Sequence, residues 1–337
     1  MAVTIKDVAA LAGVSPSTVS RTCNNNPSIS RETKEKVRRA MQQLGYEPAP
    51  SSACAQAVKL IGIILPPSQR ETFENSFFLE VIRGINRVCN NEHYISTVIT
   101  GENYDEIISA VKTMIENDII SGFIAAYSIT DDPVTEYLRS EGLKYVIIGK
   151  AAKYVDQTVY VDNDNILAGK EATEYLIALG HKRIAYLGSK NKLMFSAERK
   201  QGYIISMIDH GLEFEPENCI EAENAEEGEA SIKQLLQREN APTAIVVSDD
   251  ILAVTAERIC GEMNLSVPED ISMISFNNSL LARLTASQLT SIEINSYRLG
   301  TEAASQIIKH IEEPDLAAAK IIIPHKLIER KSCRRLS

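Results

Sequence analysis

From residue 60 onward, short apolar runs alternate with longer segments of helical periodicity. The first runs are LIGIIL (60–65), YISTVI (94–99), GFIAAY (122–127) and YVIIG (145–149), with helical stretches such as 77–90 and 104–117 between them. This alternation favours parallel sheets that are covered by helices on both faces. The sequence therefore predicts an α/β fold with parallel sheets.

A second series of the same kind follows. Its strands are expected at TVYVD (158–162), RIAYLG (183–188), AIVVSD (244–249) and ISMISF (271–276), and its helices at 166–180, 196–211 and 251–262. Two series predict two lobes. Ligands bind at the carboxyl ends of the strands in open parallel sheets, so the cleft between two such lobes is the natural pocket.

Residues 4–47 show a different pattern, which predicts three short helices. Gly13 and Val14 break the first helix, Ser15 can cap the second with Pro16 in its first turn, and a third runs from a cap at Ser30 to Gly45. The apolar positions are Ile5, Val8, Ala9, Leu11 and Ala12, then Val19, then Val37, Ala40, Met41 and Leu44. Three short helices with a tight turn between the first two form a helix-turn-helix, whose second helix enters the major groove of DNA.

Any small three-helix domain can show this periodicity, so the charge is the more telling observation. Residues 1–48 carry seven basic and four acidic side chains, a net charge of +3, whereas the whole chain carries −10. The rest of the chain therefore carries −13. A basic module on an acidic body indicates that one end binds phosphates and that the remainder does not bind nucleic acid.

Composition excludes several other classes of protein. The start, MAVTIKD, lacks the features of a signal peptide, and no apolar run approaches the length of a membrane span, so we expect a cytoplasmic protein. Its six cysteines are scattered without zinc or redox spacing, so neither a metal nor a cofactor is expected. Its five histidines are dispersed and there is no phosphate-binding glycine loop, which argues against an enzyme. A transport-type sugar receptor would need export and no headpiece.

The segment TIKDVAALAGVSPSTVSR (4–21) closely resembles the N-terminal signature of the LacI/GalR (lac-repressor) family of bacterial transcription regulators. The resemblance continues through VDND (161–164), ERKQGY (198–203) and APTAIVVSDDILA (241–253). It implies a helix-turn-helix headpiece at 1–48, a hinge at 49–59 and a two-lobed effector domain at 60–337, similar to periplasmic binding proteins. The first lobe is expected at about 60–160 and 293–320, and the second at about 161–292 and 321–332. The family's architecture also suggests that the strand LTSIEIN (289–295) and helix 297–313 return to the first lobe, with 320–330 crossing back.

The same resemblance implies which headpiece residues contact DNA. Ser17 and Arg21 would read base edges beside Pro16, because arginine can bond bidentately to guanine. Short hydroxyl and amide side chains at Thr18, Ser20 and Asn24 would hold phosphates. The full expected set is Thr4, Ser15, Pro16, Ser17, Thr18, Ser20, Arg21, Asn24 and Ser28. Thr18 and Ser20 could instead be plain surface hydroxyls.

A sugar needs planar polar groups for paired hydroxyls and an aromatic ring for its apolar face. Carried over by motif position, the expected contacts are Phe77, Phe78, Tyr127, Arg199, Asp249, Asn277 and Asn295. Alternatives remain open: Arg199 could pair with Glu198 or Glu174, Asp249 could only cap the helix 251–262, and one phenylalanine could belong to the core. Asp162 and Asn163 are expected to fix the crossover between the lobes.

The hinge departs from the family pattern. Relatives insert the leucine of an Ala-Arg-x-Leu segment into the minor groove, but EPAPSSACAQAVKLIG (47–62) has no arginine, and Ala55 stands where leucine is expected. Whether this hinge folds stays open.

We therefore predict a ligand-controlled repressor that binds palindromic operator DNA as a homodimer. The segments SQRETFENSFF (68–78), IIGK (147–150) and VDNDN (161–165) are most similar to maltose-operon repressors of Gram-positive bacteria, so maltose or a maltodextrin is the expected inducer. The alternatives are a regulator of another sugar, of a corepressor such as a phosphosugar or purine, or of global catabolite type.

Overall fold

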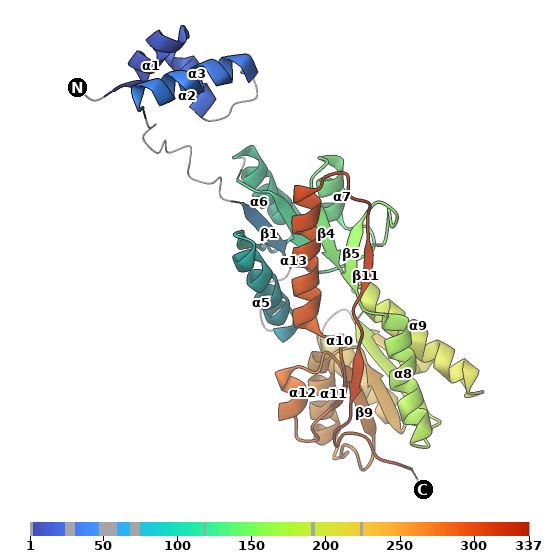
Figure 1. The fold of residues 1–337 in the computed structure, drawn as a ribbon. Coiled ribbons are helices and arrows are strands. Elements are labelled where there is room, and N and C mark those ends of the chain that lie inside the picture. Colours follow the sequence, from blue (N-terminus) through green and yellow to red (C-terminus); the bar gives the residue numbers. More distant parts are fainter. Residues whose placement is uncertain are drawn as a thin grey trace. The chain divides into compact units, whose positions relative to one another are not determined.

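The computed structural model describes residues 3–23, 31–46, 59–67, 75–117, 119–189, 193–222 and 225–336. The chain forms two compact units, residues 1–58 and 59–337. Figure 1 shows both units.

The headpiece has the three predicted helices: α1 (Ile5–Ala12), α2 (Pro16–Cys23) and α3 (Arg31–Leu44). Gly13 ends α1 in the left-handed conformation, at φ 67°, which glycine adopts without steric cost. The core consists of Val8, Ala9, Val19, Val37 and Ala40. Leu11 was wrongly assigned to the apolar face of α1: its side chain is 50% exposed, because position 11 lies beyond the edge of the face that Val8 and Ala9 bury.

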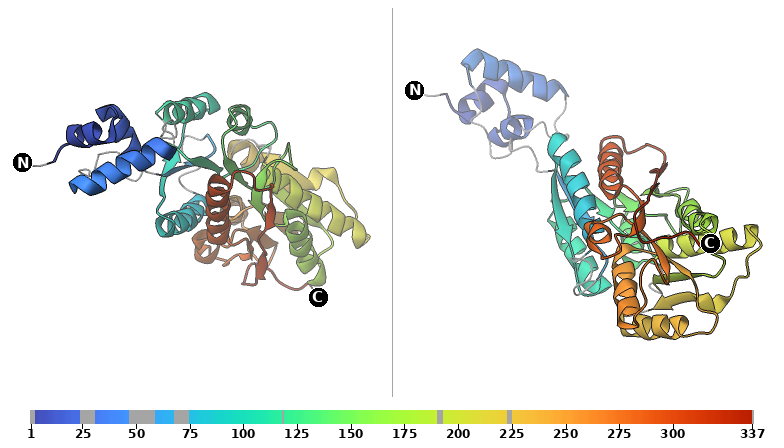
Figure 2. Two further views of the ribbon diagram at one scale, coloured as in Figure 1. Left: turned by 45° about the horizontal axis from the view of Figure 1, so that its top comes forward. Right: turned by 90° about the horizontal axis from the view of Figure 1, so that it is seen from below.

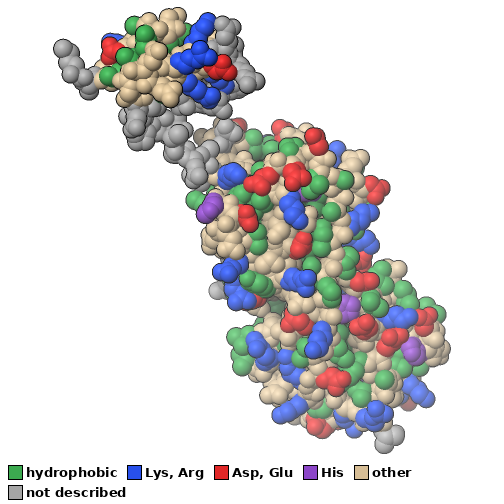
Figure 3. All heavy atoms as spheres, in the orientation of Figure 1, with side chains coloured by type: hydrophobic (Ala, Val, Ile, Leu, Met, Phe, Trp, Pro, Cys, Tyr) green, Lys and Arg blue, Asp and Glu red, His purple; other side chains and the backbone are tan. Residues whose placement is uncertain are grey.

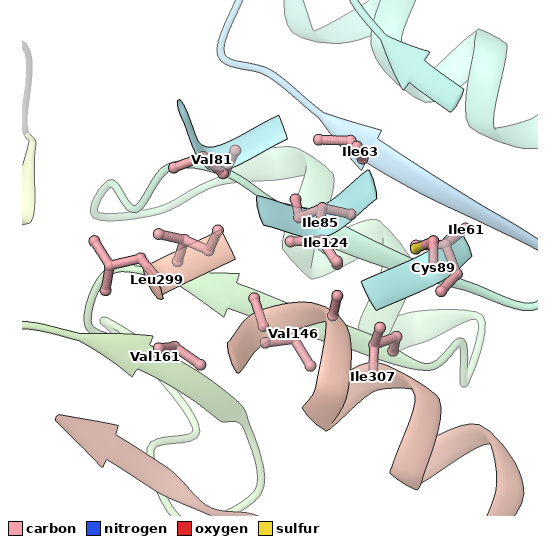
Figure 4. Close-up of a cluster of buried hydrophobic side chains, with 14 of the residues drawn as sticks. Ile61, Ile63, Val81, Ile85, Cys89, Ile124, Val146, Val161, Leu299 and Ile307 are labelled. Atoms are coloured by element: carbon pink, nitrogen blue, oxygen red, sulfur yellow. The ribbon is translucent and has the colours of Figure 1, made fainter. Parts of the chain in front are cut away.

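The first lobe contains a six-stranded parallel sheet in the order β11-β5-β4-β3-β1-β2 (Figures 1 and 2). Its strands are β1 (Leu60–Ile64), β2 (Ile95–Ile99), β3 (Gly122–Ala125), β4 (Tyr145–Ile148), β5 (Val159–Asp162) and β11 (Lys320–Ile322). Helices α5 (Ser76–Asn91) and α13 (Ser296–Glu312) pack on one core of this lobe, and α6 (Tyr104–Glu116) and α7 (Pro133–Ser140) pack on another. Figure 4 shows the core beneath α5 and α13.

The second lobe has a six-stranded sheet in the order β12-β10-β9-β8-β6-β7, in which only β12 runs antiparallel. Its strands are β6 (Ile184–Ser189), β7 (Cys219–Ala222), β8 (Ala244–Val247), β9 (Ser272–Phe276), β10 (Thr290–Glu293) and β12 (Lys326–Ile328). Its helices are α8 (Asn165–Ala178), α9 (Met194–Asp209), α10 (Ala225–Leu236), α11 (Asp250–Glu262) and α12 (Leu280–Leu284), with a 3-10 turn at Pro216–Asn218. The α/β class with parallel sheets is therefore confirmed.

Two strands belong to the other lobe from the one we expected. TVYVD was placed at the start of the second series, but β5 pairs with β4 and β11, and its Val159 and Val161 fill the first-lobe core. LTSIEIN was expected to return to the first lobe, but β10 pairs with β9, and Ile292 packs in the second-lobe core. For TVYVD, apolar periodicity finds the strand but does not say which neighbour it pairs with. For LTSIEIN, the family's architecture suggested the return to the first lobe one strand too early, because helix α13 and not β10 is the first element to pack there.

Each lobe contains one pair of helices that touch through glycines. A Cβ at Gly84 of α5 would lie 2.2 Å from the carbonyl oxygen of Tyr297 of α13. In the second lobe, a Cβ at Gly202 of α9 would lie 2.1 Å from the carbonyl oxygen of Ile166 of α8. Real side chains never approach so closely, so these positions accept only glycine while the helices stay in contact. Gly202 is the glycine of the motif ERKQGY.

Candidate functional site: a DNA-facing helix and an arginine between two lobes

Helix α2 exposes polar side chains opposite Val19, its contribution to the headpiece core. Val19 is fully buried, whereas Ser17 and Ser20 are exposed. Ser17 and Ser20 are three residues apart, so they share one face of the helix. Lysines and arginines gather on the visible face of the headpiece (Figure 3). A polar recognition face on a basic module is what major-groove binding requires.

The start of α2 is fixed by Ser15. Its hydroxyl accepts a hydrogen bond from the amide of Thr18 at 3.2 Å and lies 2.8 Å from the hydroxyls of both Ser17 and Thr18. Pro16 follows as the first helical residue and is exposed. The start of α1 is held differently: the carboxylate of Asp7 accepts hydrogen bonds from the amide and the hydroxyl of Thr4, and this pairing lowers the pKa of Asp7. Ser15 and Thr4 therefore stabilise the starts of these helices, in addition to any contact that they make with DNA.

Some of the residues expected to contact DNA lie outside the part of the chain that the structure describes. Arg21 lies on α2, but its side chain is not described. Asn24, Ser28 and the segment 47–58, which includes most of the hinge, lie outside the described residues.

Arg199 is the centre of the second candidate site. It lies on α9, its side chain is 2% exposed, and two partners hold its guanidinium. Nε donates to Oδ1 of Asn165 at 3.0 Å, and Nη1 donates to the carbonyl oxygen of Ser248 at 2.6 Å. The suggested pairing of Arg199 with Glu198 or Glu174 is not found in the part of the chain that the structure describes: Glu198 pairs with Lys150, and Glu174 with Lys170.

Aromatic rings and carboxylates surround this guanidinium. Its carbon lies 4.3 Å from the ring centroid of Phe276 and 4.8 Å from that of Phe195. Burial lowers the pKa of Arg199 to about 10, against the opposing effect of nearby charges that include Asp249 and Asp162. Burial likewise raises the pKa of Asp162 to about 7. The guanidinium of Arg199 is therefore buried, and carboxylates outnumber cations among the charged groups that act on it.

The two neighbouring aspartates at the start of α11 divide their tasks. Asp249 is the N-cap, since its Oδ1 accepts the amide of Leu252 at 2.9 Å, and burial raises its pKa. The carboxylate of Asp250 accepts hydrogen bonds from the hydroxyl of Ser275 at 2.5 Å and the amide of Ser279 at 2.6 Å. Asp250 therefore holds α11 against the end of β9. Asp249 caps α11 and is also one of the negative charges that act on the guanidinium of Arg199.

The lobes meet beside Arg199. Nζ of Lys150, which follows β4, lies 2.5 Å from Oε1 of Glu198 on α9. The amide of Met194 donates to the carbonyl oxygen of Ser128 at 3.2 Å. On the crossover side, Nδ2 of Asn163 donates to the carbonyl oxygens of Ile294 at 3.0 Å and Ile323 at 2.8 Å. The expectation that Asn163 fixes the crossover is therefore confirmed.

The remaining expected sugar contacts lie in several places. Phe77 and Phe78 are half-buried and meet edge to face at 5.2 Å; both pack on the first-lobe core, and Phe77 also packs on the second-lobe core. Tyr127 lies away from Arg199, in the other first-lobe core, and donates to Asp132 at 3.1 Å.

Two asparagines follow strands of the second sheet. Asn277 is half-buried after β9, in a left-handed conformation at φ 94°. Asn295, after β10, uses Nδ2 to donate to the carbonyl oxygen of Pro324 at 2.8 Å, so it holds a crossover segment.

Sequence reasoning missed the partners that orient Arg199. Asn165 closes the motif VDNDN and Phe276 ends ISMISF, so both lay within segments that we had singled out. The carbonyl of Ser248 could not be found, because a backbone acceptor leaves no signal in a sequence.

Among the described residues, no helix has the length and apolar character to cross a membrane. Two family models match the chain: "Bacterial regulatory proteins, lacI family" over residues 4–49, and "Periplasmic binding protein-like domain" over residues 173–333. The chain is 34% identical to the transcriptional regulator MalR of Streptococcus pneumoniae, over 98% of this chain and 100% of that protein.

Two solved structures are similar. One is named a probable maltose operon transcriptional repressor, from Staphylococcus aureus, with 28% identity, a TM-score of 0.76 and coverage of 82% of this chain and 98% of that one. The other is the regulator CelR in complex with cellobiose, with 26% identity, a TM-score of 0.76 and coverage of 98% and 100%. The chain therefore belongs to the LacI family of bacterial regulatory proteins and is a DNA-binding transcriptional repressor.

Proposed function

We propose that this protein represses a sugar-utilisation operon, most directly one for maltose or maltodextrins, and that the sugar releases it from its operator. The observation that carries this proposal is the guanidinium of Arg199. Its Nε and Nη1 are held by Asn165 and Ser248, and the ring centroids of Phe276 and Phe195 lie within 5 Å of its carbon. A fixed planar donor beside aromatic rings suits paired hydroxyls and the apolar face of a sugar.

The charge around Arg199 favours a neutral effector. Asp162, Asp249 and Asp250 all act electrostatically on this one guanidinium, and Lys150 is already paired with Glu198. A phosphosugar or a uronic acid would bring a further negative charge into this group, at a cost that grows as water is excluded. A neutral sugar avoids that cost. The similar maltose operon repressor and the cellobiose-bound regulator support the same choice.

The position of Arg199 beside the lobe contacts supplies a mechanism. A sugar held by Arg199 and first-lobe residues such as Phe77 touches both lobes, so it favours one angle between them. Binding energy that differs between two lobe angles shifts their populations, and the shift changes the affinity for DNA by the same free energy. We propose that the sugar-bound arrangement binds the operator more weakly.

A palindromic operator requires two headpieces, and we propose that a homodimer supplies them. Exposed apolar side chains provide a surface for the second copy: Leu79 on α5, Ile251 on α11, and Leu280 and Leu284 on α12. Large apolar side chains on neighbouring helices are typical of such contacts.

A gel-shift titration tests the effector. Full-length protein is bound to an operator from a maltose operon, and maltose, maltotriose, cellobiose and glucose 6-phosphate are added in parallel. We expect maltose or maltotriose to weaken the complex, and the phosphosugar to have no effect. Release by the phosphosugar alone, or tighter binding with any sugar, would contradict the proposal.

The headpiece is tested separately. Arg21→Ala should abolish sequence-specific binding, because the bidentate contact to guanine contributes roughly 1–3 kcal/mol of discrimination per base pair. Sugar affinity, measured by calorimetry, should stay unchanged. Loss of both activities would show that the two sites are not separable modules.

A further inference from the structure

The first lobe holds a pocket of about 240 Å³ that the proposed function does not use. All the residues that line it lie between Tyr127 and Thr158: they come from the segment after β3, from α7, from β4 and from the connection between β4 and β5. No second-lobe residue contributes to its described lining, so it is separate from the group around Arg199.

The lining combines rings and hydroxyls. Tyr127, Tyr145 and Tyr154 supply three aromatic rings, and Thr135 and Thr158 supply hydroxyl groups. Tyrosine rings offer an apolar surface with a polar rim, and carbohydrates are bound by such mixtures of rings and convergent polar groups. The volume is below the ~300–1,000 Å³ of pockets for drug-sized ligands, which suits a single sugar ring.

Four of the five charged residues that line the pocket are paired with one another, and the fifth, Asp132, accepts hydrogen bonds from the hydroxyl of Tyr127 and the amides of Val134 and Thr135. Nζ of Lys153 lies 2.6 Å from the carboxylate of Asp131, and Nη2 of Arg139 lies 2.5 Å from that of Glu136. An anionic ligand would have to compete with these carboxylates for the cations. A neutral polyol can instead bond to the outer edges of the paired groups, which remain planar donors and acceptors. The lining therefore favours a neutral ligand.

Tyr154 is held at the rim in an unusual conformation. Its φ is 51°, a left-handed value that is rare for an aromatic residue, and the residue is 42% exposed. The amides of Gln157 and Thr158 both donate to its carbonyl oxygen, at 2.8 and 3.0 Å, which fixes the turn. The guanidinium carbon of Arg139 lies 4.1 Å from the ring centroid. Strain of this kind concentrates at functional sites.

The pocket shares residues with the contact between the lobes. Ser128 and Ile129 both line it. The carbonyl oxygen of Ser128 accepts the amide of Met194, and Ile129 forms a β-bridge with Leu193. A ligand in the pocket would therefore press on segments that also join the first lobe to α9.

We propose that this pocket is a second carbohydrate site, which takes one ring of a neutral sugar and is coupled to the contact between the lobes. The ring can belong to a free monosaccharide or to the end of an oligosaccharide whose other rings lie near Arg199. The site goes beyond the proposed function, because a free monosaccharide would bind there without Arg199.

The absence of tryptophan from the chain allows a clean test. In full-length protein, Tyr154→Trp places a single indole at the rim of the pocket. Tyr297→Trp is the matched control, because Tyr297 is similarly exposed at 36% and also has an arginine, Arg83, against its ring at 4.7 Å. Each variant is titrated with glucose, maltose and maltotriose, alone and combined with Arg199→Lys, while its emission is recorded.

A free-monosaccharide site predicts a saturable change with glucose in Tyr154→Trp, retained with Arg199→Lys and absent from Tyr297→Trp. An oligosaccharide-end site predicts a change with maltotriose only. In that case Arg139→Met, in the otherwise native chain, should weaken maltotriose binding about tenfold, or ~1.4 kcal/mol, and leave maltose binding unchanged in calorimetry.

Two results overturn the proposal. One is the absence of any emission change with all three sugars, together with native affinities in Arg139→Met. The other is an equal change with maltose and maltotriose that vanishes with Arg199→Lys, because that signal would be relayed from the Arg199 site. Arg139→Met also serves if Tyr154→Trp does not fold. For a free-monosaccharide site, the glucose signal does not need Arg199, so failure of this proposal and failure of the proposed function give different results. For an oligosaccharide-end site, Arg139→Met lowers the affinity for maltotriose alone, whereas failure of the proposed function removes the binding of maltose as well.

Discussion

Gly169 of α8 packs against the backbone of Arg199 of α9, so closely that a Cβ at Gly169 would lie 2.2 Å from the carbonyl oxygen of Arg199. Gly202, one turn later on α9, packs equally closely on Ile166. These two contacts set the separation of the helices, and that separation allows Nε of Arg199 to reach Asn165. The arginine and the glycine of ERKQGY therefore act together. Gly202 lets α9 approach α8 closely, and at that separation the side chain of Arg199 can bond to Asn165.

Gly202→Ala should separate α8 from α9. The added methyl group would lie 2.1 Å from the carbonyl oxygen of Ile166, and overpacking of this kind costs roughly 1–3 kcal/mol. We expect a lower melting temperature and weaker sugar binding, measured by calorimetry and thermal melts.

Gly261→Ala provides the control for that substitution. Gly261 lies in α11, and a Cβ there meets no atom within 4 Å. Alanine should stabilise this helix by roughly 0.5–1 kcal/mol, because glycine is a poor helix former. A stable Gly202→Ala protein with native sugar affinity would contradict the role assigned to the glycine.

Arg199→Lys keeps the charge but removes the rigid fork that Asn165 and Ser248 hold. A buried hydrogen bond to a charged group contributes about 1.5–3 kcal/mol, so sugar affinity should fall by roughly tenfold to a hundredfold. Operator affinity without sugar should stay unchanged, which leaves the variant bound to DNA at sugar concentrations that release the native protein. Arg183→Lys is the matched control, because Arg183 is exposed and donates to the carbonyl oxygen of Ala241. Equal losses in the two variants would remove Arg199 from the site.

Most of the fold could be predicted from the sequence, because both the apolar runs of the strands and the helical spacing of apolar residues are clear in it. Strands β1, β3 and β8 lie within the expected apolar runs, and Val19 points into the headpiece core as its spacing predicts. The pairing of β5 and β10 was not predictable in the same way. Both are short apolar strands near a crossover, and only packing against a particular lobe decides which sheet they join.

The site was less predictable than the fold. Arg199 was found by its motif, but its burial between Phe276 and Phe195 depends on two separate segments of the chain meeting, because Phe195 lies on α9 with Arg199 and Phe276 ends β9. Tyr127 follows a strand, as a ligand contact would, yet the nearby Asp132 takes its hydroxyl into the core. The position of a residue at a strand end predicts where its backbone lies in the sheet. Whether its side chain points into the core or into a site depends on neighbouring residues from other segments of the chain.

Asp162 should give folding a measurable dependence on pH. Burial and the nearby Glu198 raise its pKa from 3.8 to about 7, against the opposing effects of Arg199 and of hydrogen bonds from Asn163 and Asn165. The folded protein thus keeps a proton that the unfolded chain loses, so the free energy of unfolding falls as the pH rises from about 4 to about 7, and stays lower above that.

Asp162→Asn should remove this part of the dependence. The amide oxygen can still accept the hydrogen bonds from Asn163 and Asn165. We expect the variant to gain melting temperature relative to the native protein as the pH is raised from about 5 to about 8, because only the native carboxyl must ionise in a buried place. The difference between the two proteins is the quantity to follow, since burial also raises the pKa values of Asp249 and Asp250. A difference independent of pH would mean that Asp162 does not titrate in this range.

Leu284→Asp should separate the proposed homodimer. Leu284 on α12 is 70% exposed in the single chain, and a carboxylate there would have to be desolvated against the apolar surface of a second copy. Ile208→Asp is the matched control, because Ile208 on α9 is exposed to a similar extent, at 63%, and lies outside the proposed contact. Light scattering after size exclusion should give the 37.2 kDa mass of one chain for Leu284→Asp, and twice that mass for the control. Leu284→Asp should also bind a palindromic operator more weakly, because it is monomeric. Its affinity for sugar should stay unchanged, since each chain carries its own Arg199. A dimer that survives Leu284→Asp would place the contact on another face.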